Sequence, residues 1–189
     1  MHKFIPKKFY FINTFKKNNI DKLDANTGII YRNYKQKLNI TEIINIKQYC
    51  RKRKIRFYLS NNFELAIKLN LNGVYLPSFN ENYSHLNYKI KSSFLIMGSA
   101  HNIKQIRIKE RQKVSLIFLS SIFKKNTNFL GIYKFKLLKS YTNKKVVALG
   151  GISKTNRKKI NLLSCFGFSG ISYFEQKKGP WKGALLYII

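Results

Sequence analysis

Eight short apolar segments, rich in β-branched and aromatic residues, recur along the chain, and their spacing most limits its fold. They are Phe9–Ile12, Gly28–Arg32, Phe57–Ser60, Gly73–Leu76, Phe94–Gly98, Ser115–Ser120, Val146–Gly150 and Ser169–Ser172. Successive segments begin about 17 to 30 residues apart, the length of one strand plus a crossover helix. Eight strands alternating with helices predict a parallel α/β fold, either a closed barrel or an open doubly wound sheet.

Helix-start signals precede several of the connecting segments. The candidate N-cap residues are Thr41, Asn61, Asn102 and Ser153. Asn61 with Glu64, and Asn102 with Gln105, have the spacing of a capping box. Residues 13–27 lack a clear apolar stripe, so we expect a weak first helix, and residues 77–93 have room for a short helix only.

No linker, repeat or low-complexity break divides the 189 residues, which predicts one domain over residues 1–189. No apolar stretch reaches the roughly 18 residues of a membrane span, and the apolar run at residues 9–12 is too short for a signal peptide. The two cysteines, Cys50 and Cys165, have no metal-ligand spacing. We therefore expect a reduced cytoplasmic protein without membrane contact.

The formal net charge of +30 suggests a polyanionic partner. However, 30 of the 37 cations are Lys and only seven are Arg, the residue preferred for bidentate phosphate and base recognition. The chain also contains 24 Ile and 20 Asn, and the codons of Lys, Asn and Ile are AT-rich. Compositional drift, a phosphate-bearing small substrate and nucleic acid all stay open as explanations of the charge. The basic residues are scattered along the chain, and this distribution does not favour nucleic acid as the partner.

Four segments, in a consistent order, resemble the thiamine phosphate synthase/TenI family. They are FELAIKLNLNGVYLP at residues 63–77, MGSAHN at 97–102, LSSIFKKNT at 119–127 and VVALGGIS at 146–153. The last is the most specific, and the similarity extends over about residues 8–175. The resemblance implies a compact (β/α)8 barrel.

The same resemblance implies a role in thiamine biosynthesis. The synthase joins hydroxymethylpyrimidine diphosphate to thiazole phosphate with the help of magnesium, whereas the TenI branch tautomerises thiazole phosphate. We therefore expect a divergent thiamine phosphate synthase-like transferase acting on phosphorylated small molecules. A non-catalytic barrel that binds thiazole or thiamine phosphate, and a TenI-like tautomerase, are the alternatives. A homo-oligomer is compatible with either reading, and the segment 175–189 is expected to pack on the body or on a second subunit.

The expected phosphate site comprises Gly150 and Gly151, where backbone amides and a helix capped by Ser153 can hold an anion. Ser172, at the end of the last expected strand, would complete it. At the second strand the resemblance implies that Lys35 contacts the diphosphate, with Arg32 as the second candidate. The family's arginine aligns with residue 33, and strand alternation places Arg32 on the opposite side of the strand from that residue. Solvated surface charge is the alternative for both cations.

The positions that resemble the family's metal ligands are substituted. Its two magnesium carboxylates align with Asn61 and Asn80, which are amides and leave substrate binding as their expected role. Magnesium is usually held by one or two carboxylates plus substrate phosphates. We therefore expect no cofactor, with Mg²⁺ only if the substituted site still binds it. Lys124 and Lys125 can neutralise a diphosphate instead.

The remaining candidates follow the fifth and sixth expected strands. Ser99 and His101 align with a Ser and a His of the family, and with Lys35 they are the candidate catalytic residues. For His101 a hydrogen-bonded turn residue stays open as the alternative. Thr127 is retained in the substrate-binding loop. Because active sites of such barrels lie at the carboxyl ends of the strands, we expect these residues to gather at one end. That set is Asn61, Asn80, His101, Thr127 and Gly150.

Overall fold

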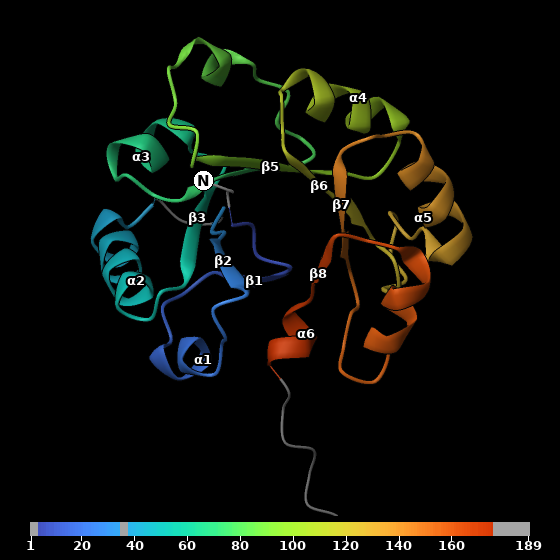
Figure 1. Ribbon diagram of the computed structural model, residues 1–189, viewed down its shortest axis with the longest axis horizontal. Coiled ribbons are helices and arrows are strands. Elements are labelled where there is room, and N and C mark those ends of the chain that lie inside the picture. The colour runs from blue at the N-terminus through green and yellow to red at the C-terminus, as the bar shows by residue number, and fades with distance from the viewer. Residues whose placement is uncertain (1–3, 35–37, 176–189) are drawn as a thin grey trace, which may run out of the picture.

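The protein is described by a computed structural model that covers residues 4–34 and 38–175 (Figure 1). The strands are β1 (Lys8–Ile12), β2 (Thr27–Tyr31), β3 (Arg56–Ser60), β4 (Gly73–Leu76), β5 (Leu95–Ala100), β6 (Leu116–Ser120), β7 (Lys145–Leu149) and β8 (Gly167–Ser169). The α-helices are α1 (Lys17–Asp21), α2 (Ile40–Lys52), α3 (Phe63–Lys68), α4 (Ile103–Arg111), α5 (Gly131–Ser140) and α6 (Ile171–Phe174). Two 3₁₀ helices, η1 (Ser84–Asn87) and η2 (Arg157–Leu163), complete the described elements.

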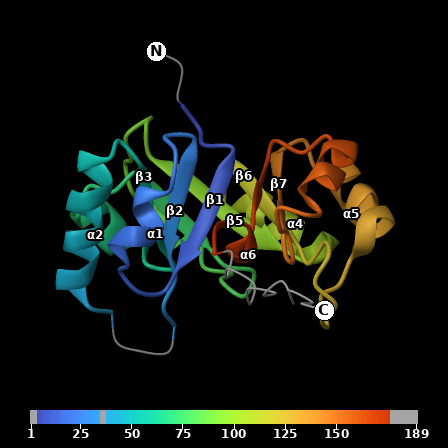
Figure 2. The ribbon, with the colours of Figure 1, turned by 90° about the horizontal axis from the view of Figure 1, so that it is seen from below.

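The strands form a closed parallel barrel in chain order, β1 to β8. The seam closes where Lys8 and Phe9 of β1 pair with Phe168 and Ser169 of β8. Figures 1 and 2 show the helices around the outside of the strands. The predicted (β/α)8 fold is confirmed, and the open sheet is excluded.

Strand alternation separates two apolar clusters. Side chains of one parity fill the barrel interior, where aromatic rings meet edge to face: the centroids of Phe9 and Phe118 are 5.0 Å apart, and those of Phe11 and Tyr75 are 5.1 Å apart. Side chains of the other parity, such as Tyr31, pack under the helices. The interior is therefore a packed core, and a ligand has access only at its ends.

At two of the expected helix starts a different residue forms the N-cap. Asn39, not Thr41, caps α2, because its side chain accepts a hydrogen bond from the Glu42 amide at 3.1 Å. Asn62, not Asn61, caps α3 through the Leu65 amide. The Asn102 cap of α4 is confirmed. The displaced cap at α3 matters for function, because it leaves Asn61 without the structural role that the sequence offered.

The last two connections also differ from expectation. No α-helix capped by Ser153 follows β7; the next element is the 3₁₀ helix η2, which begins at Arg157. Strand β8 ends at Ser169, so Ser172 is not a strand residue but lies exposed in the short helix α6. The connection after β7 therefore offers glycine amides to an anion but no α-helix end.

Two predictions fall outside the described part of the chain. Lys35 lies in the undescribed segment 35–37, and most of the segment expected to pack back lies in 176–189. The weak first helix is five residues long, and residues 77–93 hold only η1. Within the described residues, no helix combines the length and the apolar content needed to cross a bilayer.

Candidate functional site at the carboxyl end of the barrel

The residues expected to gather at one end all follow the carboxyl ends of strands, and the candidate Ser99 lies near the carboxyl end of β5 itself. Asn61 follows β3, Asn80 follows β4, His101 follows β5, and the loop of Thr127 follows β6. Gly150 follows β7. Because all eight strands are parallel in one closed barrel, these residues lie at the same end of the molecule, as the sequence predicted.

Arg32, directly after β2, faces the barrel axis. Its guanidinium carbon lies 4.7 Å from the centre of the Phe11 ring, which belongs to the interior cluster. Arg32 continues the parity of Ile30 and so points inward. Arg32 lines a cavity of about 500 Å³. Alternation placed Arg32 and residue 33 on opposite sides of the strand, and the structure shows that Arg32 is on the interior side.

One carboxylate shares this cavity. Glu175 lines it together with Arg32, and Glu175 accepts a hydrogen bond from the Tyr10 hydroxyl. Burial, and then that hydrogen bond, raise the pKa of Tyr10. The carboxylate is thus held on the β1 side, and within the described residues it forms no hydrogen bond to the glycine turn after β7.

Two hydroxyl pairs, of which the sequence indicated only Ser99, lie at the same end of the barrel. The Tyr34 and Ser60 hydroxyls are 2.6 Å apart, and the Tyr75 hydroxyl is hydrogen-bonded to the candidate Ser99. Burial raises the pKa of both tyrosines, so both are neutral at pH 7. Neutral hydroxyls can orient a polar ligand without adding negative charge.

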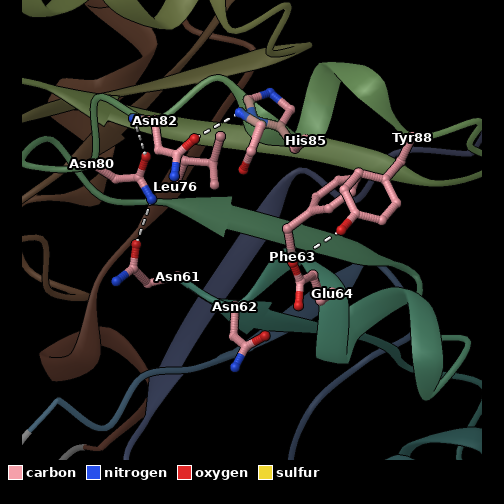
Figure 3. A pocket seen from close by; sticks show the side chains of 10 residues that line it. Asn61, Asn62, Phe63, Glu64, Leu76, Asn80, Asn82, His85 and Tyr88 are labelled. Carbon is pink, nitrogen blue, oxygen red and sulfur yellow. Dashed lines mark hydrogen bonds between the residues drawn. The ribbon is translucent and has the colours of Figure 1, made fainter.

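Asn61 and Asn80 form a direct pair (Figure 3). The Asn80 amide nitrogen donates to the Asn61 side-chain oxygen at 2.7 Å, beside a cavity of about 190 Å³. Asn61 adopts a left-handed backbone conformation with φ 59°, which asparagine tolerates better than most residues. The backbone amide of Asn61 is fixed by the carbonyl of Tyr75 at 2.8 Å.

A buried polar cluster formed by Lys109 and Gln112 holds Asn80 in place. Lys109 of α4 is fully buried, and its ammonium donates to the Asn80 backbone carbonyl at 2.7 Å and to the Gln112 side-chain oxygen at 2.9 Å. Gln112 donates in turn to the Asn80 and Asn82 carbonyls. Burial lowers the Lys109 pKa to about 8, partly offset by the charge of Glu81. In the sequence, one Lys at a buried helix position is the only sign of this cluster.

His101 is held by two hydrogen bonds, one from its ring to a backbone carbonyl and one from its own backbone amide to a side chain. Its Nδ1 lies 2.7 Å from the Ser120 carbonyl, which can only accept, so Nδ1 carries a proton. Its own amide donates to Gln105 at 2.7 Å. In the neutral ring, Nε2 therefore bears the lone pair and can accept a proton or a hydrogen bond.

Gly150 and Gly151 adopt φ values of 104° and 72°, in the region that favours glycine. A Cβ at Gly151 would lie 2.6 Å from the Lys124 backbone nitrogen, and one at Gly150 would lie 2.4 Å from the Ser121 hydroxyl. The glycine turn after β7 and the lysine loop after β6 are thus in direct contact. Lys124, Lys125 and Thr127 are all exposed on that loop.

Comparison with known proteins decides the family. The family model described as thiamine monophosphate synthase matches residues 23–174, most of the chain. The chain belongs to this family. The resemblance of the sequence motifs is thereby confirmed, and the matches support a function in thiamine biosynthesis.

Curated relatives agree with the family match. The chain is 27% identical over 142 residues to a thiamine-phosphate synthase of Methanococcus vannielii, covering 71% of this chain and 67% of the relative. It is 21% identical over 162 residues to one from Lactococcus lactis, covering 83% and 73%. Among solved structures, thiamine phosphate pyrophosphorylase from Pyrococcus furiosus superposes with a TM-score of 0.72 at 17% identity, covering 89% and 86%. That likeness shows the fold.

The donor set at Asn61 and Asn80 does not fit the magnesium ion that the family resemblance implies. Magnesium prefers carboxylate oxygens, and both positions carry neutral amides. Both lone pairs of the Asn80 side-chain oxygen are engaged, by the Gln112 amide at 3.2 Å and the Asn82 backbone amide at 3.0 Å. The Asn61 oxygen accepts from Asn80. These oxygens serve as hydrogen-bond acceptors in a protein network.

Proposed function

We propose that this chain is a thiamine phosphate synthase that binds the diphosphate of its pyrimidine substrate through protein donors rather than through magnesium. The observation that carries the proposal is the pairing of amides, not carboxylates, at Asn61 and Asn80 on a rim that also holds Arg32 and Lys124. The family match supports the reaction. Neutral amides beside cations favour a polyanion without a bridging ion.

The reaction of the family requires little covalent chemistry from the protein. The bond between the pyrimidine methylene carbon and the diphosphate oxygen breaks, and its electrons leave with diphosphate. The thiazole nitrogen then supplies the electron pair of the new carbon–nitrogen bond. Arg32, Lys124 and the Asn61 amide are the groups that would stabilise the departing negative charge, and such stabilisation is usually the largest catalytic contribution.

The thiazole phosphate has its own proposed place at the glycine turn. Gly150 and Gly151 allow close approach to the backbone, and Lys124 is in contact with them. Ser172, exposed in α6 after β8, is retained as a further hydroxyl for this site. The test is Gly151→Val, which should weaken thiazole-phosphate binding in calorimetry while diphosphate binding persists.

The decisive experiment is a turnover assay with hydroxymethylpyrimidine diphosphate and thiazole phosphate, with either EDTA or added magnesium. We expect thiamine phosphate at similar rates in both conditions. Product that disappears with EDTA and returns with magnesium would contradict the metal-free proposal. Absence of product in both conditions, with thiazole phosphate still bound in calorimetry, would favour the non-catalytic alternative.

One observation favours tautomerisation of thiazole phosphate as a second candidate. A tautomerase needs a base, and His101 presents Nε2 as a lone pair because its Nδ1 is held by the Ser120 carbonyl. Thiazole phosphate alone, followed by NMR in deuterated buffer, distinguishes the two activities. Deuterium exchange that is lost in His101→Gln supports the tautomerase, and its absence in the unchanged protein rejects it.

A further inference from the structure

Lys109 is a charged residue that the family's reaction does not call for. Its side chain is fully buried, and no carboxylate lies within ion-pair distance of it in the described part of the chain. Gly98 makes room for it, since a Cβ there would lie 2.7 Å from the Lys109 Cδ atom. A buried ammonium without a paired acid is costly, and an apolar side chain of similar volume would be cheaper. The position therefore has a reason beyond packing.

The hydrogen bonds that leave Lys109 have a fixed direction. An ammonium can only donate, so the Gln112 atom 2.9 Å away must be the amide oxygen. The Gln112 nitrogen then donates to the Asn80 side-chain oxygen at 3.2 Å. The Asn80 nitrogen donates in turn to the Asn61 oxygen at 2.7 Å. Each amide orientation agrees with the one before it, starting from the charge, and the Asn82 backbone amide, which donates to the Asn80 oxygen at 3.0 Å, supports the same orientation of Asn80.

The row of hydrogen bonds ends at a side-chain donor that is available to a ligand. With its oxygen occupied by Asn80, the Asn61 side chain keeps its NH₂ group as a donor, and Figure 3 shows this nitrogen on the side away from Asn80. Asn61 is exposed, and its nitrogen has no hydrogen-bond partner among the residues that the structure describes. A donor at the end of a polarised row of hydrogen bonds is stronger than an isolated amide.

We propose that Lys109 is a positioning residue that directs and polarises the Gln112–Asn80–Asn61 amides, so that Asn61 donates to the diphosphate of the substrate. The inference rests on the proposed function and assigns the means by which the mouth of the barrel binds diphosphate. The buried charge acts at a distance through three amides. Lys109 itself does not touch the ligand.

The test measures binding of inorganic pyrophosphate by calorimetry at pH 7 in metal-free buffer. We expect Lys109→Met to weaken binding about tenfold, as the loss of one partly screened charge implies. The matched control is Lys91→Met, which removes the same charge and a lysine–asparagine hydrogen bond, but before β5 at the opposite end of the barrel. We expect the control to bind like the unchanged protein.

A second variant covers the case in which Lys109→Met fails to fold. Gln112→Glu keeps an acceptor for Lys109 and gives it an ion-pair partner, but it removes the donor to Asn80. We expect the same loss of pyrophosphate affinity. The Asn61 side-chain NH₂ resonances should also move upfield in either variant and not in Lys91→Met, a readout that a purely structural contact would not shift.

The outcomes separate the inference from the proposed function. Unchanged pyrophosphate affinity and unchanged Asn61 resonances in both cluster variants would overturn the role of Lys109 and leave the synthase proposal standing. Absence of pyrophosphate binding by the unchanged protein would overturn both. Turnover that survives in Lys109→Met with unchanged KM for the diphosphate substrate would count against the inference alone.

Discussion

At the scale of single residues, charge and amide orientation decide the character of the site. Lys109 supplies a buried positive charge, and Asn61 and Asn80 occupy positions where the family resemblance implies acids. Together they satisfy one another, because an amide both accepts from one neighbour and donates to the next.

Restoring the two acids should create metal dependence. In Asn61→Asp combined with Asn80→Asp, two carboxylates would face each other, and a divalent ion is the natural means to relieve their repulsion. We expect magnesium to raise the melting temperature of this variant and not that of the unchanged protein. Calorimetric titration with magnesium checks it, and a variant indifferent to magnesium would contradict our assignment of these positions.

The lowered pKa of Lys109 predicts a dependence of stability on pH. Above about pH 8 the folded chain has released this proton, whereas the unfolded chain holds it to about 10.5. The unfolded state then binds more protons, so the free energy of unfolding rises with pH in this window. Between pH 7.5 and 9.5 the unchanged protein should gain about 2 kcal/mol relative to Lys109→Met.

Urea denaturation of both proteins at the two pH values measures this difference. Tyrosines and cysteines with raised pKa values, such as Tyr75 and Cys50, work in the opposite direction at high pH. They are common to both proteins and cancel in the comparison. A constant stability difference across the window would show that Lys109 keeps its ordinary pKa.

At the scale of elements, one cap decides which asparagine is free for function. Asn62 begins α3 by accepting from the Leu65 amide at 3.0 Å, so its neighbour Asn61 turns into the left-handed conformation and reaches the rim. The β4–β5 connection is held from the other side by Gln112. The position at which a helix starts thus decides which polar side chain reaches the site, and the strands alone do not decide it.

The assignment of caps can be tested on α2, away from the site. Asn39→Ala should lower the free energy of unfolding by about 1 kcal/mol, because the Glu42 amide loses its acceptor. Thr41→Ala, a change of similar size that leaves the Asn39 cap in place, should cost less than half as much. Equal losses in thermal unfolding would mean that the helix begins elsewhere.

At the scale of the whole molecule, closure of the barrel brings the rim together. Only the β1–β8 seam places Arg32 on the same ring as the Gly150 turn, because the two lie far apart in sequence. At the seam Gly167 lies against the Lys7 backbone, where an added Cβ would meet the carbonyl oxygen at 2.1 Å. A side chain at position 167 would therefore crowd the seam at which the barrel closes.

Gly167→Ala should therefore destabilise the fold by about 3 kcal/mol or more, since backbone on both sides must shift. Gly131→Ala is the matched control. Gly131, unlike Gly167, has a positive φ, 64°, but the nearest atom to its added Cβ is 3.6 Å away, so it tests backbone conformation without crowding. Its cost should stay near 1 kcal/mol, the conformational contribution alone. Similar denaturation midpoints for the two variants would refute the crowding at the seam.

The sequence by itself determined the order of strands, the parallel fold and the ring of candidate residues after the strands. These follow from local patterns, namely apolar runs and their spacing, which hold wherever the chain lies in space. The strand pattern allowed a closed barrel or an open doubly wound sheet, and the resemblance of the motifs favoured the closed barrel. The displaced caps show the limit, since Asn61 and Asn62 are equally good caps by composition.

Only the tertiary structure decided which side chains meet. The contact of Lys109 with Asn80 joins residues 29 positions apart, and the Gln112 bonds span similar distances. No local pattern distinguishes a buried lysine from the many exposed ones in a chain with 30 of them. Burial and hydrogen-bond direction are properties of packed neighbours, and those exist only once the barrel has closed.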